Sequence, residues 1–251
     1  MNGFPNSLIA RAFQRLTRSP VADNSTASLN RRLRGYPRNH DYCLDGNDIF
    51  VSRKLRERAD SIRRALPMKL GSFLDVGSCK GYFVLQASIA EGCSQAVGID
   101  VHEPFISVSN DVRNRLGRSN AAFYKASLDE LASNPQRFGG PFHTVQVVST
   151  YHYLFWGSEL EKKSFGNHQA ILAMLDRVCL RFVVFANPLD IDQCPKFIQE
   201  RARARGDCGY SRSAFLDAAD QLFDVFNIGD MDKQRKRPLL LLVKRINPAS
   251  T

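Results

Sequence analysis

The sequence has no apolar run long enough to cross a membrane. Its longest unbroken run, Ala170–Leu175, falls far short of the ~18 residues that a membrane-spanning helix needs. A hydrophobic segment of the secretory type is also missing. We therefore expect no integral membrane association and a cytoplasmic protein.

Cysteine and histidine are few and scattered. The six cysteines (positions 43, 79, 93, 179, 194 and 208) are never closer than fourteen positions apart, and the five histidines (40, 102, 143, 152 and 168) form no cluster with ligand spacing. Structural zinc sites use closely paired ligands such as C-x-x-C, so we expect no metal. Isolated cysteines also favour a reducing, cytosolic compartment.

Basic residues are concentrated at the two ends of the chain. The net charge of +10 divides into +8 for residues 1–70, −3 for 71–230 and +5 for 231–251. Such ends suit RNA or another anionic partner, although a solvated basic face is the commoner explanation. Residues 1–22 contain no acid and repeat apolar residues at helical spacing. This pattern suits a helix packed on the core, a membrane-surface segment or an organelle transit peptide.

Residues 1–69 are predicted to form a basic N-terminal extension of amphipathic helices and linker, ahead of a single domain at 70–251. Residues 23–40 are polar and rich in arginine, which predicts a loop or linker. A helix is expected over 51–66, because its apolar residues fall on one stripe with arginines opposite. Pro67 ends that helix.

From residue 72 the sequence alternates strand-like and helix-like segments. Strands are expected at 72–76, 96–100, 121–125, 144–149 and 182–186, and the intervening helices at 82–91, 105–116 and 165–179. This alternation predicts parallel β-α-β units with helices on both faces of the sheet. Two further strands, 224–228 and 239–245, are joined only by a polar loop and must pair antiparallel. The expected fold class is α/β: a Rossmann-like, doubly wound, mostly parallel seven-stranded sheet with a C-terminal antiparallel hairpin.

The segment 73–83 (FLDVGSCKGYF) joins a predicted strand to a helix through a glycine turn. A dinucleotide fingerprint starting at Gly77 would need glycine at 79 and 82, where the chain has Cys79 and Tyr82, and no P-loop pattern is present. Asp100 closes the next strand, where a carboxylate can accept both hydroxyls of a ribose. The turn therefore predicts a site for a nucleoside without a pyrophosphate.

In these features the chain resembles the class I S-adenosylmethionine (SAM)-dependent methyltransferases, over residues 70–245. Asp75, Gly77 and Gly81 match the family's first motif, E/D-x-G-x-G-x-G, with Cys79 in place of the middle glycine. The resemblance implies SAM as the cofactor, with its ribose on Asp100. It implies a cofactor site formed by Asp75, Gly77, Ser78, Cys79, Gly81, Asp100, Val101, Ser127, Leu128 and Ser149. Ser127 stands where the family often has an acid.

The architecture of this family places the methyl acceptor beyond the fourth strand, at Tyr151–Trp156. The chain lacks, at this point, the Asp/Asn-Pro-Pro-aromatic motif of amino-DNA methyltransferases, and it lacks a Pro-Cys nucleophile. His152 is the candidate catalytic base, because imidazole readily takes a proton near neutral pH. Candidates for the substrate pocket, or for cation–π contact with the sulfonium, are Tyr151, Tyr153 and Trp156. The alternative is that Tyr153 lies in the core and His152 is a hydrogen-bonded loop residue.

Four arginines after the fifth strand, at positions 201, 203, 205 and 212, would select an acidic acceptor unless they form an exposed helix face. The expected function is methyl transfer from SAM to an oxygen or nitrogen of a small molecule, metabolite or glycan. Two alternatives stay open. One is a tRNA or rRNA methyltransferase that binds phosphates through residues 1–70 and 231–251. The other is a non-catalytic partner subunit with the same fold.

Overall fold

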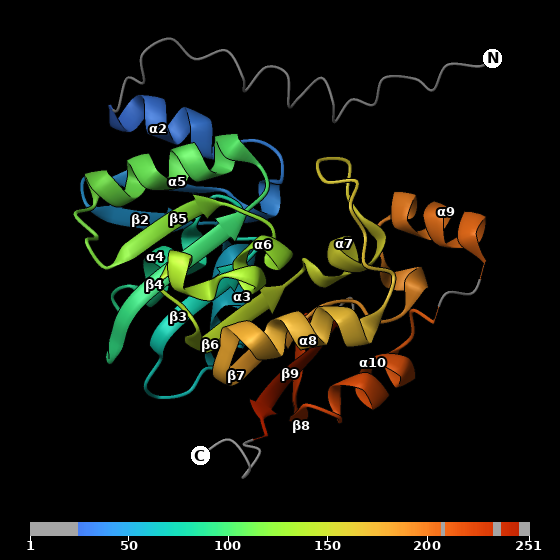
Figure 1. Cartoon of the computed structure of the whole chain (residues 1–251). Helices are drawn as coiled ribbons and strands as arrows, with labels where there is room; N and C mark the ends of the chain where they lie inside the picture. Colours follow the sequence, from blue (N-terminus) through green and yellow to red (C-terminus); the bar gives the residue numbers. More distant parts are fainter. Residues whose placement is uncertain (1–24, 207–208, 233–236, 246–251) are drawn as a thin grey trace, which may run out of the picture.

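The computed structural model describes residues 25–206, 209–232 and 237–245. Figure 1 shows a central sheet with helices on both of its faces. The strands of this sheet follow the spatial order β5 (Ala121–Lys125), β4 (Cys93–Asp100), β3 (Gly71–Val76), β6 (Phe142–Val148), β7 (Cys179–Ala186), β9 (Arg237–Lys244) and β8 (Phe223–Asp232). The first five run parallel, and β9 pairs antiparallel with both β7 and β8. The predicted mixed seven-stranded sheet and its closing hairpin are confirmed.

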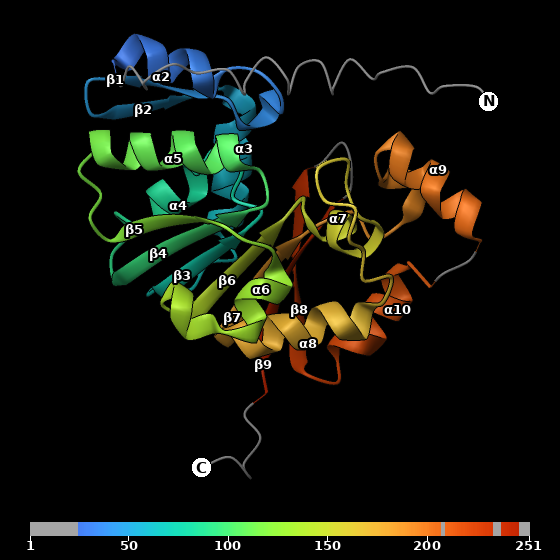
Figure 2. The ribbon, with the colours of Figure 1, turned by 45° about the horizontal axis from the view of Figure 1, so that its top comes forward.

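Each face of the sheet has its own hydrophobic core, because alternate residues of a strand point to opposite sides. Leu74 and Val76 pack on the side of helices α6 (Leu128–Ser133), α8 (His168–Val178) and α10 (Arg212–Ala219). Phe73 packs on the other side, with α4 (Tyr82–Ala87) and α5 (Glu103–Arg115). Figure 2 shows the two sets of helices on opposite faces. Burial on both faces explains why the central strands are almost wholly apolar.

The N-terminal segment forms a further layer next to α5 (Figure 2). It comprises α2 (Thr26–Leu33), the short helix η1 (Arg38–His40), a hairpin of β1 (Tyr42–Asp45) and β2 (Asp48–Val51), and α3 (Arg53–Arg63). Leu29, Leu33, Leu55 and Ile62 are buried in the same cluster as Phe73. This segment is therefore packed onto the sheet's helical layer. The helix predicted within residues 1–22 lies outside the described residues.

Two elements of this segment differ from the predictions. The predicted linker 23–40 contains α2, which Ser25 caps by accepting a hydrogen bond from the Ser28 amide at 3.3 Å. The linker prediction is wrong there because only two large apolar residues form the buried stripe of α2. The helix predicted over 51–66 begins at Arg53, since Ser52 caps it through the Leu55 amide at 3.2 Å. No helix among the described residues is long and apolar enough to cross a bilayer.

Candidate functional site

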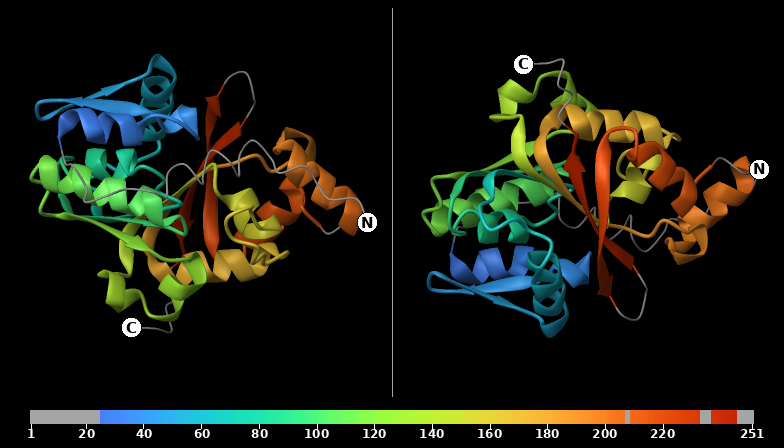
Figure 3. Two further views of the ribbon diagram at one scale, coloured as in Figure 1. Left: turned by 90° about the horizontal axis from the view of Figure 1, so that it is seen from above. Right: turned by 90° about the horizontal axis from the view of Figure 1, so that it is seen from below.

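A cavity of about 350 Å³ lies at the carboxyl ends of β3, β4 and β6. Open α/β sheets bind their ligands at this edge. Two further segments wall the cavity: residues 36–40 of the N-terminal segment and residues 158–165, which follow α7 (Tyr151–Trp156). Seen from above, the N-terminal segment lies on one side of the β8–β9 hairpin and α9 (Lys196–Arg205) on the other (Figure 3). The cavity therefore collects residues from the whole length of the described chain.

The loop between β3 and α4 is folded tightly against β4. The amides of Gly77 and Ser78 both donate to the Ile99 carbonyl, at 2.9 Å each. Gly77 has a φ of +75°, and a Cβ at this position would lie 2.4 Å from the Oγ1 of Thr150. Glycine is therefore required at 77 both for its conformation and for lack of space.

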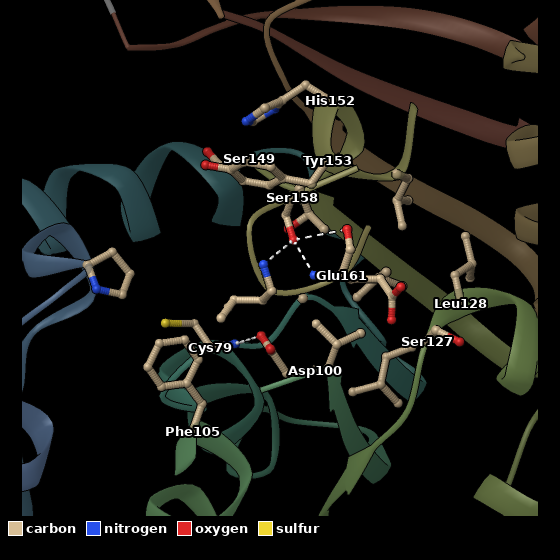
Figure 4. Close-up of a pocket in the computed structure, with 18 of the residues that line it drawn as sticks. Cys79, Asp100, Phe105, Ser127, Leu128, Ser149, His152, Tyr153, Ser158 and Glu161 are labelled. Atoms are coloured by element: carbon tan, nitrogen blue, oxygen red, sulfur yellow. Dashed lines mark hydrogen bonds between the residues drawn. The ribbon is translucent and has the colours of Figure 1, made fainter. Parts of the chain in front are cut away.

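The Asp100 carboxylate is fixed at the cavity wall by two backbone amides. The Cys79 amide donates to Oδ2 at 2.9 Å (Figure 4), and the His102 amide donates to Oδ1, also at 2.9 Å. Burial raises the pKa of Asp100 to about 6, although the amide hydrogen bonds act to lower it. At neutral pH the group is therefore mostly ionised and held in one orientation. Each oxygen keeps lone-pair capacity for a hydroxyl of a ligand.

An apolar slot adjoins Asp100. Ile99, Phe105 and Leu128 supply its apolar surface, and Ser127 lies beside them. Ser127 is held in place as the N-cap of α6 in a capping box. A slot of this kind, apolar with few polar groups, suits a flat heterocycle such as a purine.

Seven of the ten predicted cofactor residues line the cavity, namely Gly77, Cys79, Asp100, Val101, Ser127, Leu128 and Ser149. The other three, Asp75, Ser78 and Gly81, lie behind its wall. The buried Asp75 carboxyl accepts a hydrogen bond from Gln146 Nε2 at 3.0 Å, and burial raises its pKa to about 7. Asp75 therefore links β3 to β6 within the sheet, and a direct contact with a cofactor stays a prediction.

The side chains of α7 differ in whether they reach the cavity. His152 and Tyr153 line the cavity, whereas Tyr151 and Trp156 are 0% and 1% exposed in the core. The Tyr151 hydroxyl pairs with Nδ1 of His168 at 2.7 Å. Both residues are absent from the cavity lining and buried in the core, so the assignment of Tyr151 and Trp156 to the substrate pocket is wrong.

His152 is buried and lacks partners. It is 3% exposed, and neither ring nitrogen has a hydrogen-bond partner among the described residues. Burial, followed by the charge of Arg237, lowers its pKa to about 3. The imidazole is therefore neutral at physiological pH and has a lone pair that a ligand can use. Figure 4 shows His152, Ser149 and Tyr153 at one end of the cavity and Cys79, Asp100 and Phe105 at the other.

Two arginines from distant parts of the sequence meet at Ser149. Arg58 Nη2, on α3, donates to Ser149 Oγ at 3.0 Å, and Arg237 Nη1, at the start of β9, donates to the same oxygen at 2.8 Å. Arg58 Nη1 also lies 3.1 Å from Nε2 of His40, whose pKa is lowered by burial and by nearby cations. Ser149 itself has a φ of +58°, an uncommon conformation for a residue with a side chain. This junction puts concentrated positive charge at one end of the cavity.

Sequence reasoning missed both arginines of this junction. It pointed instead to positions 201, 203, 205 and 212, which lie on α9 and α10 outside the cavity. Arg201 donates to the Trp156 carbonyl at 3.1 Å, and the other three are exposed. The exposed helix face, left open as an alternative for these arginines, is what the structure describes for three of them.

Lys80 ties the N-terminal segment to the β3–α4 loop. Its ammonium group, in a side chain only 2% exposed, donates to the Leu33 carbonyl at 2.9 Å, the Gly35 carbonyl at 3.3 Å and Oδ1 of Asp41 at 2.5 Å. The Tyr42 hydroxyl donates to the Lys80 carbonyl at 2.7 Å. The wall formed by residues 36–40 is thus anchored directly to the loop that carries Cys79.

The wall formed by residues 158–165 is held by its own turn and by one ion pair. Ser158 Oγ accepts hydrogen bonds from the amides of Glu161 (2.9 Å) and Leu160 (3.2 Å), which Figure 4 draws within the cavity wall. Lys163 forms an ion pair with Asp129, the residue that follows Leu128 of the apolar slot in the sequence. This segment therefore shields the space between the slot and α7.

No protein-family model matches the sequence. A curated tRNA (guanine-N(7)-)-methyltransferase of Microcystis aeruginosa is 36% identical over 56 residues, which are 22% of this chain and 26% of that protein. This chain thus matches about a quarter of the length of its curated relative.

Solved structures resemble the chain over most of its length at low sequence identity. NodS, an N-methyltransferase of Bradyrhizobium japonicum in complex with S-adenosyl-L-homocysteine, superposes with a TM-score of 0.55 at 15% identity and covers 89% of this chain and 100% of its own. EvdMO1 gives 0.55 at 14% identity, over 86% of this chain and 46% of its own. The bifunctional kinase-methyltransferase WbdD gives 0.50 at 20% identity, over 76% and 38%.

Proposed function

We propose that this chain, which has the fold of the class I SAM-dependent methyltransferases, binds SAM and transfers its methyl group to an acceptor. The observation that carries the proposal is the Asp100 carboxylate, which two amides hold in the cavity beside the glycine loop. The neighbouring apolar slot fits the base of a nucleoside, and the hydrogen-bonding capacity of Asp100 fits its ribose. When bound, SAM supplies a methyl group made electrophilic by the sulfonium.

The residues of the cavity divide between the parts of this cofactor. Asp100 orients the ribose, and Ile99 and Leu128 enclose the adenine. Arg58 does not itself line the cavity, but it reaches the lining residue Ser149 through a hydrogen bond of 3.0 Å, and its charge acts on Asp75 and Cys79. A guanidinium at this place suits the carboxylate of the cofactor's amino-acid end.

At the acceptor end the chain contributes alignment, exclusion of water and a proton acceptor. Residues 36–40 and 158–165 wall the reacting centre, and alignment of the reactants supplies a large part of the catalysis in such a displacement. We assign His152 as the base: its neutral imidazole, without a partner among the described residues, takes the proton that an attacking hydroxyl or amine loses. Tyr153 lies beside it in the same wall.

We infer that the acceptor is a small molecule, such as a metabolite or a glycan unit, methylated at oxygen or nitrogen. The cavity between the two walls measures about 350 Å³ in all, and the cofactor and the acceptor share it. Sites of this size take small ligands. The cavity also argues against a purely non-catalytic subunit, whose cofactor pocket would need no such opening.

The proposal is tested by calorimetric titration of cofactor-free protein with SAM. We expect affinity on the order of micromolar, in the usual range for enzyme ligands, and at least about tenfold weaker binding for Asp100→Ala. Asp217→Ala, at an exposed position on α10, is the matched control and should bind like the wild type. Folded protein that gives no heat with SAM, or an Asp100→Ala variant with unchanged affinity, would overturn the proposal.

A further inference from the structure

The cavity extends beyond the residues assigned to the cofactor, and its wall changes character there. Tyr36, Tyr153 and Phe197 line this part. The rings of Tyr153 and Phe197 are stacked, with centroids 6.0 Å apart and planes at 12°. Arg237 lines the cavity here, and the guanidinium of Arg201 lies over the Phe197 ring, 5.6 Å from its centroid. An aromatic surface flanked by guanidinium groups suits a ligand that has an apolar body and an acidic group.

The sheet itself places Arg237 at this point. In the antiparallel pairing of β9 with β7, Leu239 lies opposite Ala186, the last residue of β7. Arg237 is two residues earlier on β9, so it projects past the end of β7 and on the same face as Leu239. Leu239 belongs to the core cluster that also contains residues of α3. Because Arg237 is on the same face of β9 as Leu239, it lies on the side of α3, and there it meets Arg58 at Ser149. On its other side, Arg237 pairs with Asp232 of β8, next to an irregularity of the register between Asp230 and Asp232.

The charge of Arg237 acts on the residues at the acceptor end. It is a cause of the lowered pKa of His152, and it also lowers the otherwise raised pKa of Tyr153. Arg237 lines the cavity together with His152 and Tyr153, and Glu159, which also lines it, acts on Tyr153 in the opposite sense. A neutral imidazole beside a guanidinium is a poor base, and an anion bound to that guanidinium would offset the opposing charge.

We propose that the methyl acceptor carries an oxyanion, a carboxylate or a phosphate, that binds Arg237 beside Ser149 and presents the atom to be methylated to His152. The proposal rests on the proposed methyltransferase function and names its substrate class. The planar guanidinium matches carboxylate and phosphate oxygens in pairs. Ser149 Oγ, which accepts from both arginines, holds them in position for such a ligand.

Binding of this anion would also prepare the reaction. With the charge of Arg237 offset, His152 accepts the proton from the acceptor's hydroxyl or amine more readily. The acceptor oxygen or nitrogen then forms its bond to the methyl carbon. The carbon–sulfur bond breaks with its electron pair going to sulfur, and the proton leaves with His152 and passes to solvent after product release. An acceptor without the anion would lack this effect.

The same oxyanion chemistry could come from the cofactor's own carboxylate. We assign that carboxylate to Arg58, which acts on the β3–α4 loop, and the acceptor's anion to Arg237, which acts on His152 and Tyr153. The two sources differ in a measurable way. If Arg237 bound the cofactor's carboxylate, an Arg237 variant would bind S-adenosylhomocysteine, which has the carboxylate, more weakly. Its affinity for methylthioadenosine, which lacks the carboxylate, would not change.

The test uses fluorine NMR of para-fluorobenzoate and its neutral analogue para-fluorobenzamide, each added to the protein with and without S-adenosylhomocysteine. We expect the benzoate to bind at least about tenfold more tightly than the amide, to be displaced by inorganic phosphate, and to lose this preference in Arg237→Gln. Arg237→Lys, which keeps the charge but not the planar group, should keep part of it. Arg203→Gln, an exposed arginine on α9, is the matched control and should behave like the wild type.

Equal binding of benzoate and amide, or a preference that Arg237→Gln leaves unchanged, would overturn the proposal. So would an Arg237→Gln variant that weakens S-adenosylhomocysteine but not methylthioadenosine, since the anion would then be the cofactor's. A benzoate preference that depends on Arg237 in a protein that binds neither SAM nor S-adenosylhomocysteine would instead refute the methyltransferase function and leave the oxyanion site standing.

Discussion

The buried Lys80 should be one of the residues on which both stability and cofactor binding depend. Its ammonium group is the junction between the N-terminal segment and the β3–α4 loop, with two carbonyls and the Asp41 carboxylate as acceptors. Lys80→Met keeps most of the aliphatic stem and removes every one of these hydrogen bonds. Two backbone carbonyls and one carboxylate would then be left without this donor.

The expected cost follows from the burial of the pair. Removing one partner of a buried ion pair costs about 3–5 kcal/mol, and the 28% exposure of the Asp41 side chain places the expectation near the lower end, about 3 kcal/mol. That is a large part of the ~5–15 kcal/mol by which a domain is stable. A chain of this size should therefore stay folded, with a melting temperature lower by roughly 10 °C.

Denaturant unfolding measures this loss, and hydrogen exchange locates it. Amides near residues 33–42 should lose protection first, and SAM affinity should fall because residues 36–40 wall the cavity. Arg63→Met is the control: Arg63 and its partner Asp60 are 72% and 50% exposed, so its loss should cost no more than about 0.5 kcal/mol. If Lys80→Met lowers the free energy of unfolding no more than this control does, the junction contributes nothing and the reasoning fails.

Three further predictions concern the site. Asp75, with its pKa raised to about 7 in the folded protein, favours folding below its unfolded pKa of ~3.9 and loses this contribution as pH rises through the folded value. From pH 5 to pH 7 the free energy of unfolding should therefore fall by roughly 2 kcal/mol more in the wild type than in Asp75→Asn, as measured by urea unfolding at several pH values. Gly77→Ala should cost more stability than Gly117→Ala, because both positions have positive φ but only the first leaves no space for a Cβ; thermal unfolding of the pair with equal losses would contradict the steric argument. His152→Asn should lower kcat by about a hundredfold or more while SAM affinity in calorimetry stays the same, and an unchanged kcat would remove His152 as the base.

The sheet could be predicted because its signals are local. Apolar runs alternate with helical stretches from residue 72 onward, and the central strands are buried on both faces, so the pattern is strong within these elements. The N-terminal layer was harder to predict. The stripe of α2 consists of Leu29 and Leu33 alone, and β1 and β2 are four residues each, too short for a periodic pattern to be recognised.

The two ends of the cavity also differ in how far the sequence predicts them. The cofactor end is built from contiguous segments, so the motif around Gly77 and the carboxylate of Asp100 could be found from spacing alone. At the acceptor end the sequence showed a cluster of aromatics but not which way each would face. Only the structure shows that, within the six-residue helix α7, Tyr151 packs in the core while Tyr153 lines the cavity. A motif read without its secondary structure overstates the number of site residues.

The arginine junction could not have been found from any local pattern. Arg58 and Arg237 are 179 positions apart in the chain, and each stands in a basic stretch of the sequence that does not indicate which member reaches Ser149. What brings Arg237 to Ser149 is the register of β9 on β7, in which Leu239 pairs with Ala186. A shift of that register by one residue would turn Arg237 to the opposite face of the sheet, away from α3. The charge at the acceptor end, and with it the class of acceptor that we propose, therefore depends on strand pairing between segments that carry no shared signal in the sequence.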